Sequence, residues 1–159
     1  MKKSAKAKRK VAIFDIDGTI FRSSVLIALT DELMIEGTAR EVMRHIQQLR
    51  KEAGVDPQAM VTVQLPVFNE VLVVNQLLDA VSKLDYPREK LQIQILDDST
   101  DDTCLVCEEG AEGLRARGFD IMYLHRDNRV GFKAGALEEA MPHTKGEFLL
   151  IFDADFVPQ

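Results

Sequence analysis

Aromatic side chains are scarce in this chain of 159 residues: tryptophan is absent, and Phe and Tyr together make up 6%. Long apolar runs are absent as well. No run approaches the roughly 20 residues that a membrane-spanning helix needs, so the sequence predicts no transmembrane segment. The basic start is not followed by the apolar core and small-residue cleavage site of a signal peptide. With 46% hydrophobic and 29% charged residues, the composition indicates a globular domain with a core of its own.

Cysteine is almost as scarce, since Cys104 and Cys107 are the only two. Their C-x-x-C spacing falls within an expected helix. No second pair of Cys or His residues follows at the spacing of a zinc site. Redox and metal roles stay open, but two reduced cysteines on a helix are the simplest interpretation.

Positive charge is concentrated at the start of the chain. Residues 1–60 carry 11 Lys and Arg against 8 Asp and Glu, whereas residues 61–159 carry 9 against 18. Six of the positive charges lie in residues 1–10, which we expect to form a disordered, solubilising arm. No aromatic residues are interleaved with these lysines, and the rest of the chain is acidic. The charge distribution therefore argues against nucleic acid as a partner.

Strand-like and helix-like segments alternate in the second part of the chain. Apolar runs predict four strands, at Val61–Leu65, Leu91–Leu96, Phe119–Leu124 and Phe148–Phe152. Helical spacing predicts three helices between them, at 70–83, 101–117 and 132–141. This alternation predicts an α/β fold with a parallel sheet, right-handed crossovers and helices on both faces.

Polar residues follow each predicted strand, at the edge of a parallel sheet where ligands collect. They are Pro66 to Glu70, Asp97 to Thr103, His125 to Gly135, and the pair Asp153 and Asp155. The last pair could hold a divalent cation on a diphosphate, because hard cations prefer carboxylate oxygen. Helix capping is the alternative for some of the others, and we expect Asn69 to cap the helix at 70–83.

The motifs VTVQLPVFNE, LDYPREKLQIQILDDSTDDT, LHRDNRVGFKAGAL and GEFLLIFDADFVP occur in order between residues 61 and 159. Together they resemble the amino-terminal half of the processive family 2 glycosyltransferases, the cellulose-synthase-like and glucomannan-synthase-like group. The resemblance implies a Rossmann-like GT-A fold that binds a UDP- or GDP-linked sugar. It also implies cytoplasmic localisation, because the full-length transferases are membrane proteins with a cytoplasmic catalytic domain.

The same resemblance implies roles for particular residues. Those implied to contact the nucleotide-sugar donor are Pro66, Phe68, Glu70, Asp97, Asp98, Arg129, Lys133 and Asp153. Asp153 and Asp155 would hold Mg²⁺ or Mn²⁺, which acts as a Lewis acid for the departing nucleoside diphosphate. The family places its general-base Asp and its Gln-x-x-Arg-Trp acceptor motif after this point, and the chain has no Trp. We therefore expect donor binding with incomplete catalysis.

Residues 10–37, KVAIFDIDGTIFRSSVLIALTDELMIEG, resemble the opening of a haloacid-dehalogenase (HAD) superfamily phosphatase. In that family's D-x-D-G-T motif, the first Asp attacks phosphorus and the second is a general acid or base. The resemblance implies these roles for Asp15 and Asp17 and makes a Mg²⁺-dependent phosphatase the alternative function. The later Ser or Thr, Lys and acidic pair of that family do not follow in context.

These patterns predict four parts of the chain: a basic arm (1–10), a HAD-like strand with helices (11–54), a linker (55–60) and a truncated GT-A domain (61–159). The join could be natural, truncated or engineered, and an inactive chimera is a third functional reading. An uncovered edge of the sheet would favour self-association.

Overall fold

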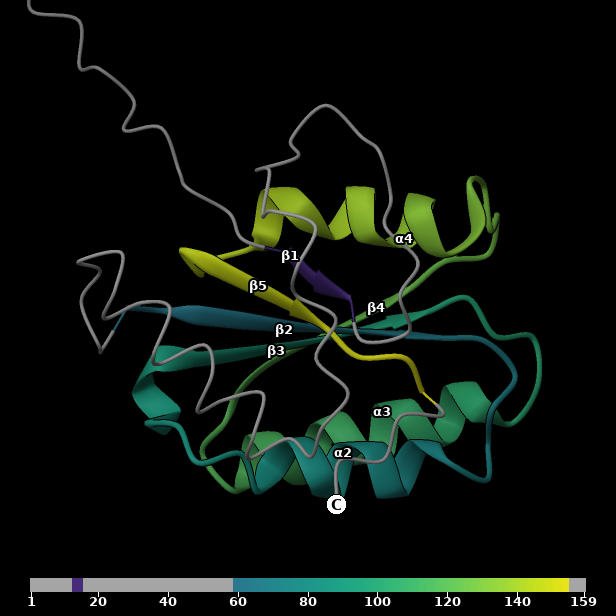
Figure 1. Ribbon diagram of the computed structural model, residues 1–159. Helices are drawn as coiled ribbons and strands as arrows, with labels where there is room; N and C mark the ends of the chain where they lie inside the picture. Colours follow the sequence, from purple (N-terminus) through teal and green to yellow (C-terminus); the bar gives the residue numbers. More distant parts are fainter. Residues whose placement is uncertain (1–12, 16–58, 155–159) are drawn as a thin grey trace, which may run out of the picture.

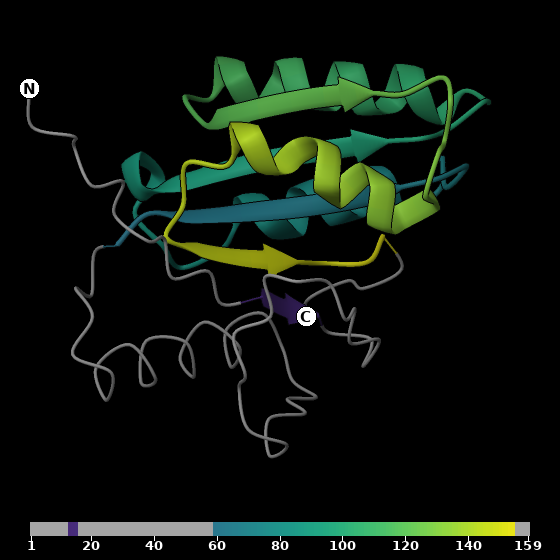
Figure 2. The ribbon, with the colours of Figure 1, turned by 90° about the horizontal axis from the view of Figure 1, so that it is seen from above.

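The computed structural model describes residues 13–15 and 59–154, which form a parallel sheet between layers of helices (Figure 1). Within these described residues the sheet has five strands: β1 (Ile13–Asp15), β2 (Val61–Val67), β3 (Leu91–Asp97), β4 (Asp120–His125) and β5 (Phe148–Ile151). Their spatial order is β1-β5-β2-β3-β4, and every neighbouring pair is parallel. Figure 2 shows all the strands running in the same direction. The predicted α/β class and parallel sheet are confirmed.

Among the residues that the structure describes, α-helices cover both faces of the sheet (Figure 1). The first face carries α2 (Val74–Ser82) and α3 (Thr103–Ala116), and the second carries α4 (Phe132–Ala140). Short 3-10 turns, η1 (Arg88–Lys90) and η2 (Met141–His143), precede β3 and follow α4. The predicted elements match within a few residues, except that α2 begins at Val74 rather than at residue 70.

The main hydrophobic core lies between the sheet and the α2–α3 layer. Ile93 and Ile95 of β3 point into it, whereas Leu96 points to the other face and packs against Ala136 of α4. Gly110 lies where α3 crosses α2, and a Cβ there would lie 2.3 Å from the Leu78 Cδ1. The glycine therefore permits the close approach of the two helices.

The α4 face carries a layer of buried, hydrogen-bonded polar side chains. The Thr62 hydroxyl donates to the Gln92 Oε1 at 2.8 Å, and the same oxygen accepts from the Lys145 backbone N–H at 2.9 Å. The Gly146 N–H donates to the Thr62 Oγ1 at 2.9 Å. These bonds fix the segment that leads into β5, so that β5 pairs with β2 in a defined register.

The strand order reverses beside β2. Successive strands β2, β3 and β4 lie side by side in one direction, and β5 then returns to the opposite side of β2. In open α/β sheets, the crevice at the carboxyl ends of such a reversal is the usual place for a ligand. On its other side β5 pairs with β1, with Asp15 opposite Ile151. Self-association through a sheet edge stays a prediction.

None of the helices that the structure describes is long and apolar enough to cross a membrane.

Candidate functional site

A lysine and an aspartate meet at the carboxyl edge of the sheet. Asp153 lies two residues beyond β5, and Lys133 lies in the first turn of α4. The Lys133 Nζ is 2.5 Å from the Asp153 Oδ1. Solvent reaches both side chains, whose exposed fractions are 24% and 20%. A carboxylate and an ammonium group therefore lie together here. A metal-bound diphosphate requires both kinds of charge, since the carboxylate can hold the metal and the ammonium group can balance phosphate charge.

Asp98 forms a two-point ion pair with Arg126. The Arg126 Nε and Nη2 donate to the two carboxylate oxygens at 2.7 and 2.5 Å. Both side chains are buried, with exposed fractions of 4% for Arg126 and 5% for Asp98. The same guanidinium donates to the carbonyl oxygens of Val130 and Phe132 at 3.2 and 3.0 Å. Arg126 thus fixes both the Asp98 carboxylate and the loop that leads into α4.

That loop has unusual backbone geometry. Gly131, at the N-cap of α4, has a φ of 75°, and the non-glycine residues Arg129 and Phe132 also have positive φ, at 43° and 51°. Residues other than glycine rarely adopt this left-handed backbone conformation. A Cβ on Gly135 would lie 1.9 Å from the Val130 carbonyl oxygen, so only glycine permits the loop to lie this close to α4.

The loop after β2 is fixed by two neighbouring segments. The Arg129 guanidinium lies over the Phe68 ring, 3.2 Å from its centroid, in a cation–π contact. Asn69, with a φ of 54°, donates its backbone N–H to the Ser99 Oγ and accepts from the Thr100 N–H, both at 2.9 Å. The prediction that Asn69 caps α2 is wrong, because its side chain bonds to the loop after β3.

These segments enclose a cavity of about 290 Å³ at the reversal of strand order. All but one of the predicted donor-binding residues line it: Pro66, Phe68, Glu70, Asp98, Arg129, Lys133 and Asp153. Asp97 is the exception and is not among the lining residues. Asp155, the second predicted metal ligand, lies outside the described residues.

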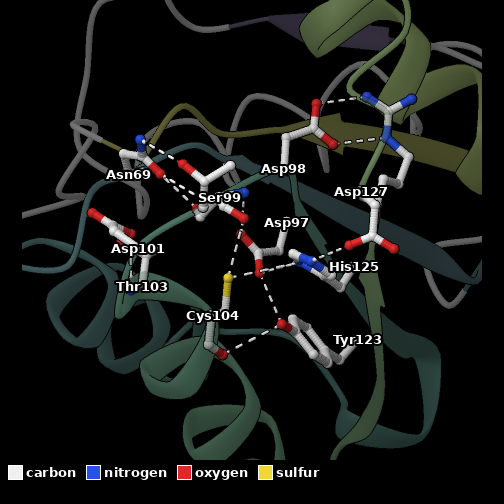
Figure 3. Close-up of polar contacts among 12 residues, drawn as sticks. Asn69, Asp97, Asp98, Ser99, Asp101, Thr103, Cys104, Tyr123, His125 and Asp127 are labelled. Atoms are coloured by element: carbon white, nitrogen blue, oxygen red, sulfur yellow. Dashed lines mark hydrogen bonds and ion pairs between the residues drawn. The ribbon is translucent and has the colours of Figure 1, made fainter.

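Asp97 points to the opposite face of the sheet, toward α3 (Figure 3). Its side chain is fully buried. The Ser99 N–H donates to its Oδ1 at 2.9 Å, and the Tyr123 hydroxyl donates to its Oδ2 at 2.8 Å. The His125 Nδ1 lies 2.9 Å from the same Oδ2, and the Cys104 Sγ lies 3.8 Å from that Nδ1. Asp97 therefore belongs to a second polar cluster, separated from the cavity by the sheet.

Burial and the Asp97 charge together affect the pKa values of the two neighbouring thiols. Burial would raise the pKa of Asp97, but hydrogen bonds from Ser99, Tyr123 and His125 outweigh it, and the pKa lies below its usual value. Burial, with the Asp97 charge second, raises the pKa of the Cys104 thiol. The same two causes, in the same order, raise the pKa of Cys107 to about 12. Both cysteines are free thiols, as the sequence suggested.

Sequence reasoning missed this second cluster. Asp97, Cys104 and His125 come from β3, α3 and β4, so no local spacing reveals that they meet. The alternation of side chains along β3 was the available signal, because it places consecutive residues on opposite faces of the sheet.

A search against protein-family models finds one described as "Glycosyl transferase family 2", which matches residues 62–159. This chain belongs to the family 2 glycosyltransferases. The match covers the segment that contains β2 to β5 and the cavity, and it confirms the family that the sequence motifs indicated.

Curated relatives of this glycosyltransferase include plant enzymes. The chain is 42% identical over 113 residues to a probable glucomannan 4-beta-mannosyltransferase 7 of Oryza sativa subsp. japonica, and 41% identical over 113 residues to glucomannan 4-beta-mannosyltransferase 2 of Arabidopsis thaliana. Each alignment covers 69% of this chain. The chain spans only 19% and 21% of the length of these relatives.

Solved structures confirm the GT-A-like fold. The mannosyltransferase PcManGT of Pyrobaculum calidifontis, solved in complex with GDP-Man and Mn²⁺, is 29% identical with a TM-score of 0.57. That alignment covers 74% of this chain and 36% of PcManGT. TarS of S. aureus is 24% identical with a TM-score of 0.52, over 60% of this chain and 16% of TarS, and supports the fold alone.

The phosphatase prediction is not supported by this family match, which begins at residue 62. The structure describes only the backbone of Asp15, in β1, and Asp17 lies outside the described residues. Catalytic roles for both residues therefore stay predictions.

Proposed function

We propose that this glycosyltransferase domain binds a nucleotide-activated sugar in the cavity between the carboxyl ends of β2 and β5. The observation that carries the proposal is the convergence of Glu70, Asp98, Arg129, Lys133 and Asp153 on one cavity. Acidic groups can hold a metal and accept hydrogen bonds from a nucleoside, and cations can balance phosphate charge. GDP-mannose is the donor that we expect, because PcManGT is similar and its structure contains that donor.

Each part of the donor has a matching group in the proposed site. Asp98 presents a carboxylate fixed by Arg126, and its remaining lone pairs can accept from a base N–H or a ribose hydroxyl. Lys133 and Arg129 supply positive charge for the diphosphate.

Asp153 fits a Mg²⁺ or Mn²⁺ ligand, because its carboxylate lies at the cavity and is partly open to solvent. When bound, such an ion stabilises the departing nucleoside diphosphate as a Lewis acid. In the structure the Asp153 carboxylate is paired with Lys133, and because both side chains line the cavity, the lysine would lie near a phosphate oxygen of a diphosphate bound there.

Calorimetric titration with GDP-mannose and with a UDP-sugar, each with and without Mn²⁺, tests the proposal. We expect binding that requires Mn²⁺, falls at least about tenfold in Asp153→Asn and favours GDP-mannose. Asp120→Asn is the matched control, because Asp120 begins β4 at the opposite edge of the same sheet and pairs with Lys145. The proposal is wrong if neither nucleotide binds at millimolar concentration, or if both variants lose binding equally.

A further inference from the structure

Three metal-ligating side chains of different chemistry meet on the α3 face of the sheet. They are Asp97 at the end of β3, Cys104 in the first turn of α3 and His125 at the end of β4. Their ligand atoms all lie within 4.8 Å of one another. Figure 3 shows Cys104 and His125 directed toward Asp97, whereas Asp98 is directed away from them. The cluster is thus separate from the donor cavity.

We propose that Asp97, Cys104 and His125 bind a zinc ion. Zinc prefers thiolate sulfur, imidazole nitrogen and carboxylate oxygen, the three donors that this cluster offers. In tetrahedral zinc sites, ligand distances of about 2.0–2.3 Å place neighbouring ligand atoms roughly 3.3–3.8 Å apart. The Cys104 Sγ to His125 Nδ1 distance of 3.8 Å fits this spacing, and the His125 Nδ1 to Asp97 Oδ2 distance of 2.9 Å needs a small outward shift.

Groups outside the three proposed ligands contact two of them. The His125 Nε2 lies 3.4 Å from the Asp127 Oδ1, and zinc binding at Nδ1 would release the proton that this nitrogen shares with Asp97. The Tyr123 hydroxyl and the Ser99 N–H orient the two oxygens of Asp97. Metal ligands are commonly fixed by such outer contacts.

Solvent reaches the cluster. The His125 side chain is 33% exposed, and Cys104 is partly exposed, so an ion and its water can enter from solvent. Cys107, one turn further along α3, is fully buried within the hydrophobic core. This difference makes Cys104 the ligand and Cys107 a packing residue.

Zinc at this position would join the ends of β3 and β4 to the start of α3. The residue after Asp97 is Asp98, which lines the donor cavity on the other face. The ion would thus rigidify the strand end that carries Asp98. The zinc proposal does not depend on the proposed donor site, because the two share no ligand.

Cobalt substitution tests the proposal, since thiolate-bound Co²⁺ produces a charge-transfer absorption band that carboxylate ligands do not produce. We expect the intact chain, kept reduced with a phosphine, to show this band at one equivalent of Co²⁺ and to lose it when Zn²⁺ is added. Only Cys104 and Cys107 can supply a thiolate. The band should disappear in Cys104→Ser and persist in Cys107→Ala.

His125→Gln and Asp97→Asn should each weaken cobalt affinity by more than about tenfold. Asp153→Asn should leave the band unchanged, which separates this site from the proposed donor site. Far-ultraviolet circular dichroism checks that each variant is folded. The zinc proposal is overturned if the intact chain shows no band in tenfold excess of Co²⁺, or if the band survives in Cys104→Ser.

Discussion

Asp97 and Asp98 are neighbours in the sequence but lie in different surroundings on the two faces of the sheet. Asp98 is paired at two points with Arg126 and lines the cavity at the carboxyl edge of the sheet. Asp97 accepts hydrogen bonds from Ser99 and Tyr123 beneath α3, beside His125. The comparison teaches that two consecutive acids at a strand end contact separate groups of residues, because successive side chains of a strand alternate between faces.

We expect the largest loss of stability from a substitution on the cavity face of the sheet. Asp98→Ala would leave the buried Arg126 without its carboxylate partner, and we expect a loss of about 3–5 kcal/mol in the free energy of unfolding. Urea denaturation measures it. Replacing both partners, as Asp98→Leu with Arg126→Met, should recover most of that loss, since no buried charge then remains unpaired. A loss below about 1 kcal/mol in Asp98→Ala would show that the ion pair does not fix this face.

Three glycine substitutions compare the packing of the two faces. Gly135→Ala places a Cβ 1.9 Å from a backbone oxygen on the cavity side, so we expect destabilisation of about 3 kcal/mol. Gly110→Ala meets the flexible end of Leu78 on the other side and should cost about 1 kcal/mol. A Cβ on Gly113 would have no atom within 4 Å, so Gly113→Ala is the control.

Thermal unfolding of the three variants should rank them in that order. The control should be slightly stabilised, by up to about 1 kcal/mol, because alanine favours a helix interior. If Gly110→Ala destabilised the domain more than Gly135→Ala, the α4 loop would be the more adaptable of the two regions.

Replacing Asp97 should reduce the stability of the domain by a smaller amount, and that amount should depend on pH. Because the folded-state pKa of Asp97 is lowered, its stabilising contribution is present above the ordinary value of 3.8 and is lost as the pH falls below it. In metal-free protein, Asp97→Asn should therefore reduce stability at pH 7 by about 1–2 kcal/mol and have a smaller effect near pH 3. Denaturant titrations at both pH values measure this, and equal effects at both would contradict the prediction.

The sequence predicted the sheet well, because strand runs and helix spacing are local signals. Val61, Leu91 and Phe148 were each correctly placed at the start of a strand. The convergence of polar residues on the carboxyl edge was also predictable, since it follows from a parallel sheet.

Contacts between separate elements could not be predicted from such local sequence signals. Asn69 is of a residue type that often caps helices. Its side chain instead contacts Thr100, which is 31 residues away in the sequence. Cys104 had no recognisable partner at any standard spacing, because Asp97 and His125 reach it only through the pairing of β3 with β4. Side-chain contacts between separate elements need the fold before they can be predicted.

The position of β5 between β1 and β2 has a consequence for how the domain forms. Val61 of β2 pairs with Phe148 of β5, so this side of β2 can be completed only after the much later residues of β5 have been synthesised. Contacts so distant in sequence form slowly, because closing the intervening loop reduces chain entropy. The half-sheet of β2, β3 and β4 can assemble first, and the cavity, which needs Asp153 beyond β5, forms only after β5 has joined it.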